Sequence, residues 1–264
     1  EANSSTDIQS YLISLLVKYI DAALATEFSA ANKFVARRVF DLVSALACEL
    51  SSKSDNVIHT IIDRARVFST VISERLRSQA CNMLGCFASH LAAFSIRSDN
   101  KTEKNQMKDG LLMVQELLLS RLTDKSQTVR FGAIQAAGVL YRSLNSVSSH
   151  ECEVGFSSSP ALLDGLLWSM WHDTSVANRV EAIRAVPIYS AEILDHVIAR
   201  IRDVKEKVRV AAIDALSLKV DPRRREIMTA EHFRDIVRYG LTTRCDSTKN
   251  VATALICTKW TKAA

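Results

Sequence analysis

Glycine and proline are both scarce in this chain. Seven glycines and three prolines occur among 264 residues, whereas these two residue types together usually make up roughly 12% of a protein. Tight hairpin turns and β-bulges depend on such residues, so a fold rich in β-hairpins is excluded. The hydrophobic content of 48% is enough for a continuous core. The composition therefore predicts an almost wholly α-helical protein.

The sequence also lacks the patterns that carry chemistry. It has no glycine-rich loop that could hold a nucleotide phosphate on backbone amides. Its histidines show no paired metal-ligand spacing, and the adjacent His150, Glu151 and Cys152 do not readily converge on one ion. No nucleophile–base pair can be identified. We therefore expect a protein that is not an enzyme and that uses no cofactor, no metal and no small-molecule substrate.

Long apolar runs and paired cysteines are missing as well. No stretch approaches the roughly 20 apolar residues that span a bilayer, so we expect no membrane contact. The six cysteines include no Cys-x-x-Cys pair, and most fall on apolar helical faces, where we expect reduced and buried thiols. The net charge of +5 permits an anionic partner without requiring one.

Helical periodicity runs through almost the whole chain and is organised as a repeat. Apolar residues recur at steps of three and four, which predicts about twelve helices, or about six helix pairs. Four segments share an acidic or polar residue followed five and six residues later by an apolar–basic pair, the last copy being degenerate. They begin at Asp124, Asp173, Asp203 and Thr243, spaced unevenly around the roughly 40 to 47 residues of HEAT units. We predict an all-α HEAT-repeat solenoid that forms a single domain over residues 1–264.

Each part of the repeat has an expected structural role. The acidic residue follows the first helix of a pair, the apolar residue enters the core, and later alanines let neighbouring helices approach closely. The basic residue can reach the acidic residue of the neighbouring repeat, so we expect Arg130, Arg179 and Arg209 to serve structure rather than ligand binding. The alanines that we expect to be buried are Ala133, Ala136, Ala182, Ala185, Ala212 and Ala215.

Three further features lie within or beside the repeat. Asn178 stands where two other copies have a valine, and Arg77 belongs to an earlier copy of the apolar–basic pair. Polar breaks at residues 51–55, 95–105, 146–159 and 221–225 are expected to join packed helices. Trp168 and Trp171, three residues apart, would suit a recognition surface, but at helical spacing we expect them in the core.

The later repeats resemble a particular family. The run from Arg200 to Val220, with Arg-Asp-Val-Lys, then Val-Arg, then a helix ending in Lys-Val, is similar to the G subunits of condensin, the chromosome-compacting complex. The segment from Tyr239 to Trp260, with its Gly-Leu pair and terminal tryptophan, also resembles that family. The resemblance covers roughly residues 30–264. Since family members are much longer, it implies the N-terminal arm of a longer protein.

The resemblance implies a non-catalytic subunit that works in mitotic chromosome condensation. Its implied partners are the kleisin subunit of condensin, double-stranded DNA held through its phosphates without sequence specificity, and other condensin subunits indirectly. The implied location is the nucleus and chromosomes, with a cytoplasmic pool allowed. The alternative is a HEAT-repeat scaffold that binds only proteins, of the phosphatase-scaffold or transport-receptor type. Basic residues on one continuous face would favour DNA binding, and scattered ones would favour the scaffold.

Basic residues concentrate between His196 and Arg225, where nine basic residues accompany four acidic ones. Charge at the turns between helices of a solenoid would line one rim and suit phosphates. The main candidates for DNA contact are Arg202, Lys205, Lys207, Arg223, Arg224 and Arg225. The weaker candidates are Lys33, Arg37, Arg38, Arg75, Arg77 and Lys125.

Overall fold

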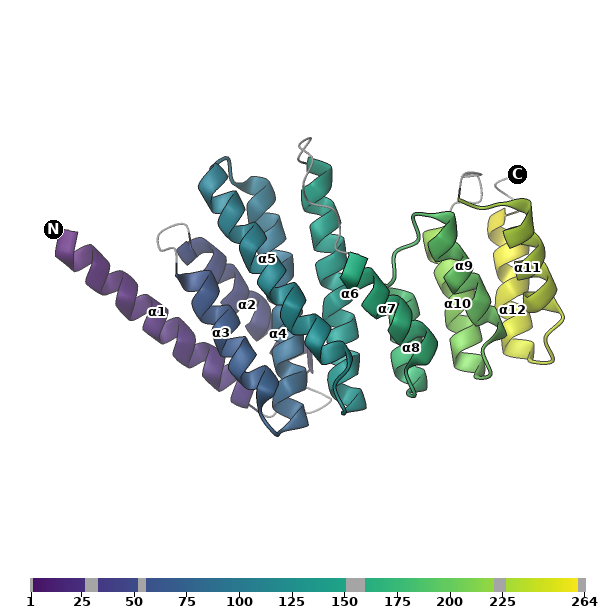
Figure 1. The fold of residues 1–264 in the computed structure, drawn as a ribbon, viewed down its shortest axis with the longest axis horizontal. Helices are drawn as coiled ribbons and strands as arrows, with labels where there is room; N and C mark the ends of the chain where they lie inside the picture. Colours follow the sequence, from purple (N-terminus) through teal and green to yellow (C-terminus); the bar gives the residue numbers. More distant parts are fainter. Residues whose placement is uncertain (1, 27–32, 52–55, 151–159, 221–226, 261–264) are drawn as a thin grey trace. The chain divides into compact units, whose positions relative to one another are not determined.

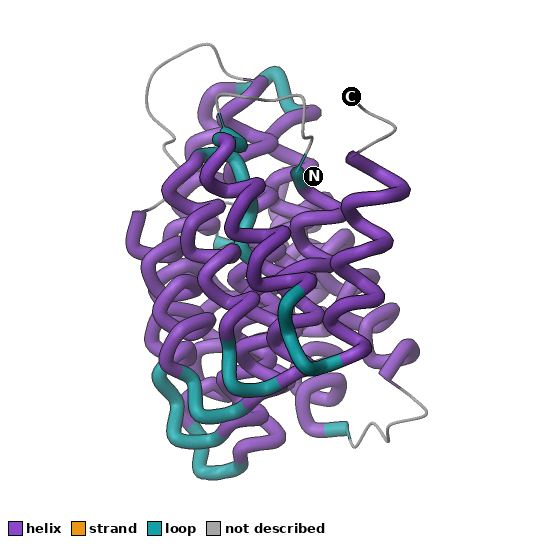
Figure 2. The backbone as a smooth tube through the Cα atoms, turned by 90° about the vertical axis from the view of Figure 1, so that its right-hand side faces the viewer, coloured by secondary structure: helices purple, strands orange, loops and turns teal. Residues whose placement is uncertain are grey.

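The protein is a series of helices joined by short connections (Figure 1). The structure is a computed structural model that describes residues 2–26, 33–51, 56–150, 160–220 and 227–260. These described residues contain no strand (Figure 2), which confirms the all-α fold. None of the described helices is both long and apolar enough to cross a bilayer.

The chain forms two compact units, and the first of them is Glu1–Gly165. It contains three helix pairs in sequence order. These are α1 (Ala2–Ala25) with α2 (Lys33–Ser51), α3 (Val57–Thr70) with α4 (Glu74–Arg97), and α5 (Lys101–Leu122) with α6 (Gln127–His150). Helices α1, α3 and α5 pack side by side in one layer, and α2, α4 and α6 pack in the other. This stacking of successive pairs is that of an α-solenoid.

The second unit is Leu166–Ala264 and repeats the same plan. Its helices are α7 (Pro160–His172), which begins in the first unit, then α8 (Val176–Ala185), α9 (Ala191–Ala199), α10 (Glu206–Lys219), α11 (Ala230–Leu241) and α12 (Asp246–Ala254). A 3₁₀ turn, η2 (Arg200–Arg202), extends α9, and a π-helical turn, η3 (Leu255–Trp260), extends α12. Helix α10 packs between α8 and α12, while α11 packs on α9. A single domain over residues 1–264 stays a prediction.

Short polar side chains begin several of these helices. Asn100 accepts a hydrogen bond from the backbone amide two residues later, at 2.9 Å, and so starts α5. At the start of α11, the Thr229 hydroxyl accepts from the His232 amide, while Nδ1 of His232 accepts from the Thr229 amide. This reciprocal pair is a capping box in which histidine takes the usual place of glutamate.

Small residues let the two layers pack closely. The six alanines predicted to be buried are all at most 7% exposed, which confirms their place in the core. Gly85 of α4 lies against Ala136 of α6, where an added Cβ would be only 3.0 Å from the Ala136 Cα. Gly240 of α11 approaches Ala252 of α12 even more closely, since an added Cβ would lie 2.8 Å from the Ala252 Cβ.

The prediction that Trp168 belongs to the core is wrong. Its side chain is 50% exposed, because the buried stripe of α7 runs through Leu166 and Met170 and Trp168 lies on the other side of the helix. Trp171 is half-buried, and its Nε1 donates to Nδ1 of His196 at 3.1 Å. The predicted break at residues 146–159 is also shorter than expected, because α6 continues to residue 150.

The cysteines follow the expectation only in part. The five described cysteines form no disulfide. Cys48 and Cys81 are buried as predicted, and burial raises the pKa of each thiol to about 12. Cys257, in the turn η3, is however exposed. Cys86 and Cys245 are half-buried, and Cys152 lies outside the described residues.

Candidate functional site

The turns that join the two helices of a pair share one structure. Oδ1 of Asp124 accepts a hydrogen bond at 2.9 Å from the backbone amide two residues later. Asp173 and Asp203 make the same contact at 2.8 and 2.9 Å. Each side chain thereby closes its own turn. The aspartates of the repeat are therefore structurally equivalent, as their spacing predicts.

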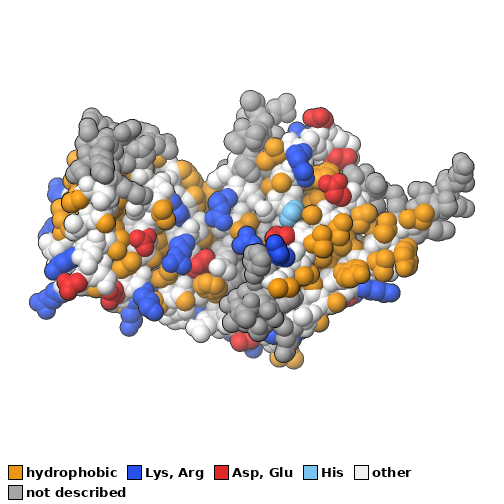
Figure 3. All heavy atoms as spheres, turned by 180° about the vertical axis from the view of Figure 1, so that it is seen from behind, with side chains coloured by type: hydrophobic (Ala, Val, Ile, Leu, Met, Phe, Trp, Pro, Cys, Tyr) orange, Lys and Arg blue, Asp and Glu red, His pale blue; other side chains and the backbone are white. Residues whose placement is uncertain are grey.

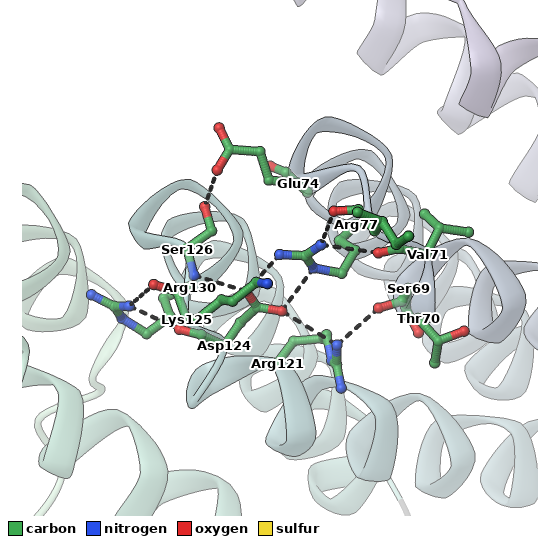
Figure 4. Close-up of polar contacts among 12 residues, drawn as sticks. Ser69, Thr70, Val71, Glu74, Arg77, Arg121, Asp124, Lys125, Ser126 and Arg130 are labelled. Carbon is green, nitrogen blue, oxygen red and sulfur yellow. Dashed lines mark hydrogen bonds and ion pairs between the residues drawn. The ribbon is translucent and has the colours of Figure 1, made fainter.

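The arginine of one repeat binds the aspartate of the next. Arg77 donates from Nε and Nη2 to the two carboxylate oxygens of Asp124, both at 2.9 Å (Figure 4). Arg179 donates from Nη2 to Oδ1 of Asp203 at 3.3 Å. We call these two contacts, Arg77–Asp124 and Arg179–Asp203, the Arg–Asp ladder. They confirm that the basic residue reaches the neighbouring repeat.

The same arginines also stabilise the turn of their own repeat. Nη1 of Arg179 donates to the carbonyl of Asp173 at 2.9 Å, and Nη1 of Arg130 donates to the carbonyl of Asp124 at 2.8 Å. Arg209 binds the carbonyl of Asp203 in the same way, at 2.9 Å. These contacts agree with the structural role expected of the three arginines.

Asp124 is held by more than its ladder partner. Both Arg77 and Asp124 have side chains only 5% exposed, and Arg121 adds a contact to Oδ2 at 3.3 Å. Burial raises the pKa of the Asp124 carboxyl, but hydrogen bonds from Arg77 and the Ser126 amide, with the charges of Arg77 and Arg121, outweigh it and hold that pKa below its usual value. The Asp124 hydrogen bond in turn raises the pKa of Arg77.

A second arginine at each contact of the Arg–Asp ladder was not predicted from the sequence. Arg121 and Arg200 each lie three residues before a repeat aspartate and contact it, Arg200 at 3.6 Å from Asp203. The shared position, three before the aspartate, was visible in the sequence. Asn178, which stands where two other copies have a valine, also has a structural role. Its Nδ2 donates to Oδ2 of Asp173 at 3.0 Å, a hydrogen bond within one repeat.

Several predicted DNA-contact residues are exposed at the turn edge, the end of each unit where the within-pair turns lie. Lys205 and Lys207 are exposed at the start of α10, and Lys125 is exposed in the turn before α6. Arg202 is also exposed, and its guanidinium lies 4.8 Å from the centre of the Tyr239 ring. In the second unit, Arg202, Lys205 and Lys207 are therefore all exposed near the turn between α9 and α10.

The other candidates divide into three groups. Arg77 is 4% exposed and engaged by Asp124, so it presents no surface to a phosphate. Arg75 is half-buried and donates to the carbonyls at the end of α1. Arg37 and Arg38 are exposed on α2.

The side chain of Lys33 and the residues Arg223, Arg224 and Arg225 lie outside what the structure describes. Val220, the last described residue before the three arginines, ends α10 at the opposite end from Lys205. The histidine of the possible metal cluster is in α6, but its side chain and residues 151–152 are likewise outside the described part. Among the described residues, no group of three His, Cys, Asp or Glu side chains could hold a metal ion.

Comparison with known proteins identifies the fold. No protein-family model matches this chain, and no curated protein matches its sequence. Among solved structures, the chain is similar to a chain of the crystal structure of the S. pombe condensin Cnd3-Cnd2 subcomplex, with a TM-score of 0.64 and 18% sequence identity. The match covers 93% of this chain but 28% of that one. The chain therefore shares its α-solenoid fold with a subunit of that condensin subcomplex.

Proposed function

We propose that the chain is a HEAT-repeat subunit of a condensin-type complex and acts there as a non-catalytic scaffold. The observation that carries this proposal is the fold likeness to the condensin Cnd3-Cnd2 subcomplex over 93% of the chain. The residue pattern that resembles condensin G subunits is independent support, because it is a property of the sequence rather than of the fold. The assignment to the G subunit in particular belongs to the proposal.

The proposed protein partner is a kleisin-type subunit. Large apolar side chains are exposed on the first two helices, among them Ile8, Tyr11 and Tyr19 of α1 and Leu42 of α2, each at least 60% exposed. Figure 3 shows hydrophobic side chains gathered over this part of the molecule. Contiguous exposed apolar surface is typical of a protein interface. It also fits the alternative, a HEAT scaffold that binds only proteins.

The proposed nucleic-acid contact is through phosphates at the turn edge of the second unit. Lys205 and Lys207 are exposed, and Arg202 is held beside them against Tyr239. Exposed lysines at the start of one helix can contact the backbone of a duplex without reading its bases. We propose that double-stranded DNA is bound there regardless of sequence, and that the protein acts in the nucleus and on chromosomes, with a cytoplasmic pool.

The DNA contact is tested by replacing Lys205 and Lys207 together with alanine. Each phosphate contact contributes about −0.9 to the slope of log K against log salt, so the double variant should flatten that slope by up to about 1.8. Affinity for two duplexes of unrelated sequence should fall alike. The measurement is a fluorescence-anisotropy titration of the parent and variant chains at several salt concentrations.

A matched control removes the same charge elsewhere. Lys101 and Lys104 lie at the start of α5, at the opposite end of that helix from the Asp124 turn. Replacing both with alanine should leave the salt slope unchanged. Equal effects of the two double variants would mean that net charge alone is measured, and would refute a contact at the turn edge.

The kleisin contact is tested by co-purification with a kleisin subunit of condensin. Stable co-elution of the two chains supports the condensin assignment. If the kleisin does not co-elute and no duplex binds, the protein-only scaffold replaces the condensin proposal. Microscopy of the tagged protein tests the location, since the condensin proposal requires it to accumulate on mitotic chromosomes.

A further inference from the structure

The Arg–Asp ladder is interrupted at the last repeat. Thr243 occupies the place of the repeat aspartate, because its Oγ1 accepts a hydrogen bond from the amide two residues later, at 3.4 Å, as Asp203 does in its own turn. A threonine hydroxyl offers no carboxylate. The preceding repeat arginine, Arg209, therefore lacks the partner that Arg77 and Arg179 have.

Arg209 is nevertheless held in the ladder orientation. Its Nη1 donates to the carbonyl of Asp203 at 2.9 Å, just as Nη1 of Arg179 donates to the carbonyl of Asp173 at 2.9 Å. In Arg179 this contact leaves Nη2 directed at the aspartate of the next repeat, 3.3 Å away. Arg209 is thus positioned for a carboxylate that Thr243, at the aspartate position of the next repeat, does not supply.

A hollow of about 470 Å³ opens beside Arg209, lined by residues of η2, α10, α11 and the turn before α12. Arg202, Arg209 and Arg244 all line it, together with Tyr239, Thr243 and Cys245. Among the described residues, no carboxylate lies within ion-pair distance of any of these three arginines. Three arginines therefore line one hollow without an ion pair to any described carboxylate.

Two acids, Asp203 and Glu206, lie near the hollow, and neither forms an ion pair with the arginines that line it. Asp203 lines it, but its carboxylate is contacted by Arg179 at 3.3 Å and by Arg200 at 3.6 Å. Glu206 is exposed, and hydrogen bonds from Ser247 and Cys245, together with the nearby charge of Arg209, lower the pKa of its carboxyl. Glu206 therefore offsets only part of the positive charge, and the hollow attracts anions.

We propose that this hollow, the Arg209 pocket, binds an aspartate or glutamate side chain from an acidic segment of a partner protein. The incoming carboxylate takes the position of the missing repeat aspartate and accepts hydrogen bonds from Arg209. Arg244 and Arg202 lie at the rim, the latter held 4.8 Å from the centre of the Tyr239 ring. The inference does not rest on the proposed condensin function, because the register of the repeat carries it.

A carboxylate on a flexible chain suits this pocket better than a phosphate of a duplex. Arg209 is half-buried, so its acceptor must reach below the surface. Duplex phosphates are fixed on a wide, stiff helix and are met by exposed side chains such as Lys205 and Lys207. The complete rung Arg77–Asp124 also shows the two-point geometry that arginine forms with a carboxylate.

The test restores the missing carboxylate within the chain. Thr243→Asp places an acid where the other repeats have one, so its carboxylate should occupy the pocket. The affinity for a labelled triglutamate peptide should then fall by about tenfold, which is the free energy of about one hydrogen bond to a charged group. Thr243→Asn, which has nearly the same shape and no charge, is the control and should bind like the parent. The same peptide with three glutamines should not bind the parent chain.

Two further measurements keep the outcome independent of folding. Arg244→Gln changes an exposed side chain and should also weaken the triglutamate peptide. Thr248 and Arg209 lower the pKa of the Cys245 thiol, so iodoacetamide should label it readily, and bound peptide should slow this labelling but not that of exposed Cys257. Unchanged peptide affinity in both Thr243→Asp and Arg244→Gln overturns the proposal.

Competition separates the pocket from the DNA contact. A duplex that binds through Lys205 and Lys207 loses affinity in their double variant but retains it in Thr243→Asp, which weakens the peptide. If inorganic phosphate or duplex slows the labelling of Cys245 by iodoacetamide while triglutamate does not, the pocket is a phosphate site, and the acidic-peptide proposal is wrong.

Discussion

Breaking the rung between Arg77 and Asp124 should have the largest effect of any charge removal in the first unit. Both side chains are about 5% exposed, and Arg77 makes two hydrogen bonds of 2.9 Å to the carboxylate and two more to the carbonyls of Val71 and Ile72. Removing one member of a buried ion pair costs about 3 to 5 kcal/mol, because the other charge stays buried without its partner. In Arg77→Ala, Asp124 still keeps Arg121 and the Ser126 amide, so we expect the lower figure, about 3 kcal/mol.

The assay is urea denaturation at pH 7, followed by far-UV circular dichroism, with hydrogen exchange of α4 and α6 to locate the loss. Because repeats contact only their neighbours, the effect should concentrate in those two helices. Arg37→Ala is the control, since Arg37 and Asp41 are 4.0 Å apart and their side chains are 75% and 44% exposed. Such pairs contribute about 0 to 1 kcal/mol. A loss in Arg77→Ala no greater than in Arg37→Ala would refute the ladder as a source of stability.

Three other perturbations follow from the same geometry. The pKa of Asp124 is lower in the folded protein, so its contribution to the free energy of unfolding is complete above the unfolded pKa, near 4, and is lost as the pH falls through the folded pKa. The difference in stability between the parent and Asp124→Asn should therefore be constant from about pH 7 to 5 and shrink below about pH 4. Urea titrations at several pH values in which this difference does not shrink would contradict the prediction. Gly240→Ala should destabilise by about 1 to 3 kcal/mol, because the new Cβ would lie 2.8 Å from that of Ala252; the intrinsic helix preference for alanine predicts the opposite sign, so thermal unfolding distinguishes the two. The stability of Trp168→Ala should stay within about 0.5 kcal/mol of that of the parent. Trp171→Ala should lose at least about 1 kcal/mol more, because Trp171 packs against the Arg200 guanidinium, 3.4 Å from its ring centre, and binds His196. Equal stabilities of the two variants in denaturation would show that our placement of α7 is wrong.

The repeat was predictable because its chemistry is local. An aspartate that closes its own turn and an arginine six residues later that caps the same turn must recur wherever the turn recurs, so Asp124, Asp173 and Asp203 could be aligned from the sequence. Burial of the repeat alanines followed from the same register. The degenerate copy at Thr243 is also visible in the sequence. Its consequence is not, because the missing carboxylate matters only to Arg209, which lies 34 residues earlier in the chain.

The uneven spacing of the repeat has a structural cause that the sequence did not reveal. Helices α8 and α9, which separate Asp173 from Asp203, have 10 and 9 residues. Helices α10 and α11, which separate Asp203 from Thr243, have 14 and 12. Helix α10 is thus longer than α8 by about one turn, since a turn takes about 3.6 residues, whereas α9 with its extension η2 matches α11 in length. The rest of the difference lies in the longer connection from α10 to α11, over residues 220–229. A change of a whole turn keeps the same face directed inward, so the repeat tolerates it.

The exposure of Trp168 and the burial of Arg77 could not be read from residue type. A tryptophan beside leucines is most often in the core, and an arginine is most often at the surface. Both expectations failed because exposure depends on which face of a helix the neighbouring pair covers. That information lies in contacts between repeats rather than within the 13 residues of α7.

The molecule carries two classes of charged side chain, those buried in the Arg–Asp ladder and those exposed to solvent. Dissolved ions shield charges that water surrounds, and they shield charges enclosed by protein much less. The pair Arg77–Asp124 is enclosed, whereas Lys205 and Lys207 are surrounded by solvent. Concentrated salt should therefore wash any bound polyanion from the lysines while the helix pairs keep their register, so a purification that strips nucleic acid with salt leaves an intact solenoid for reassembly.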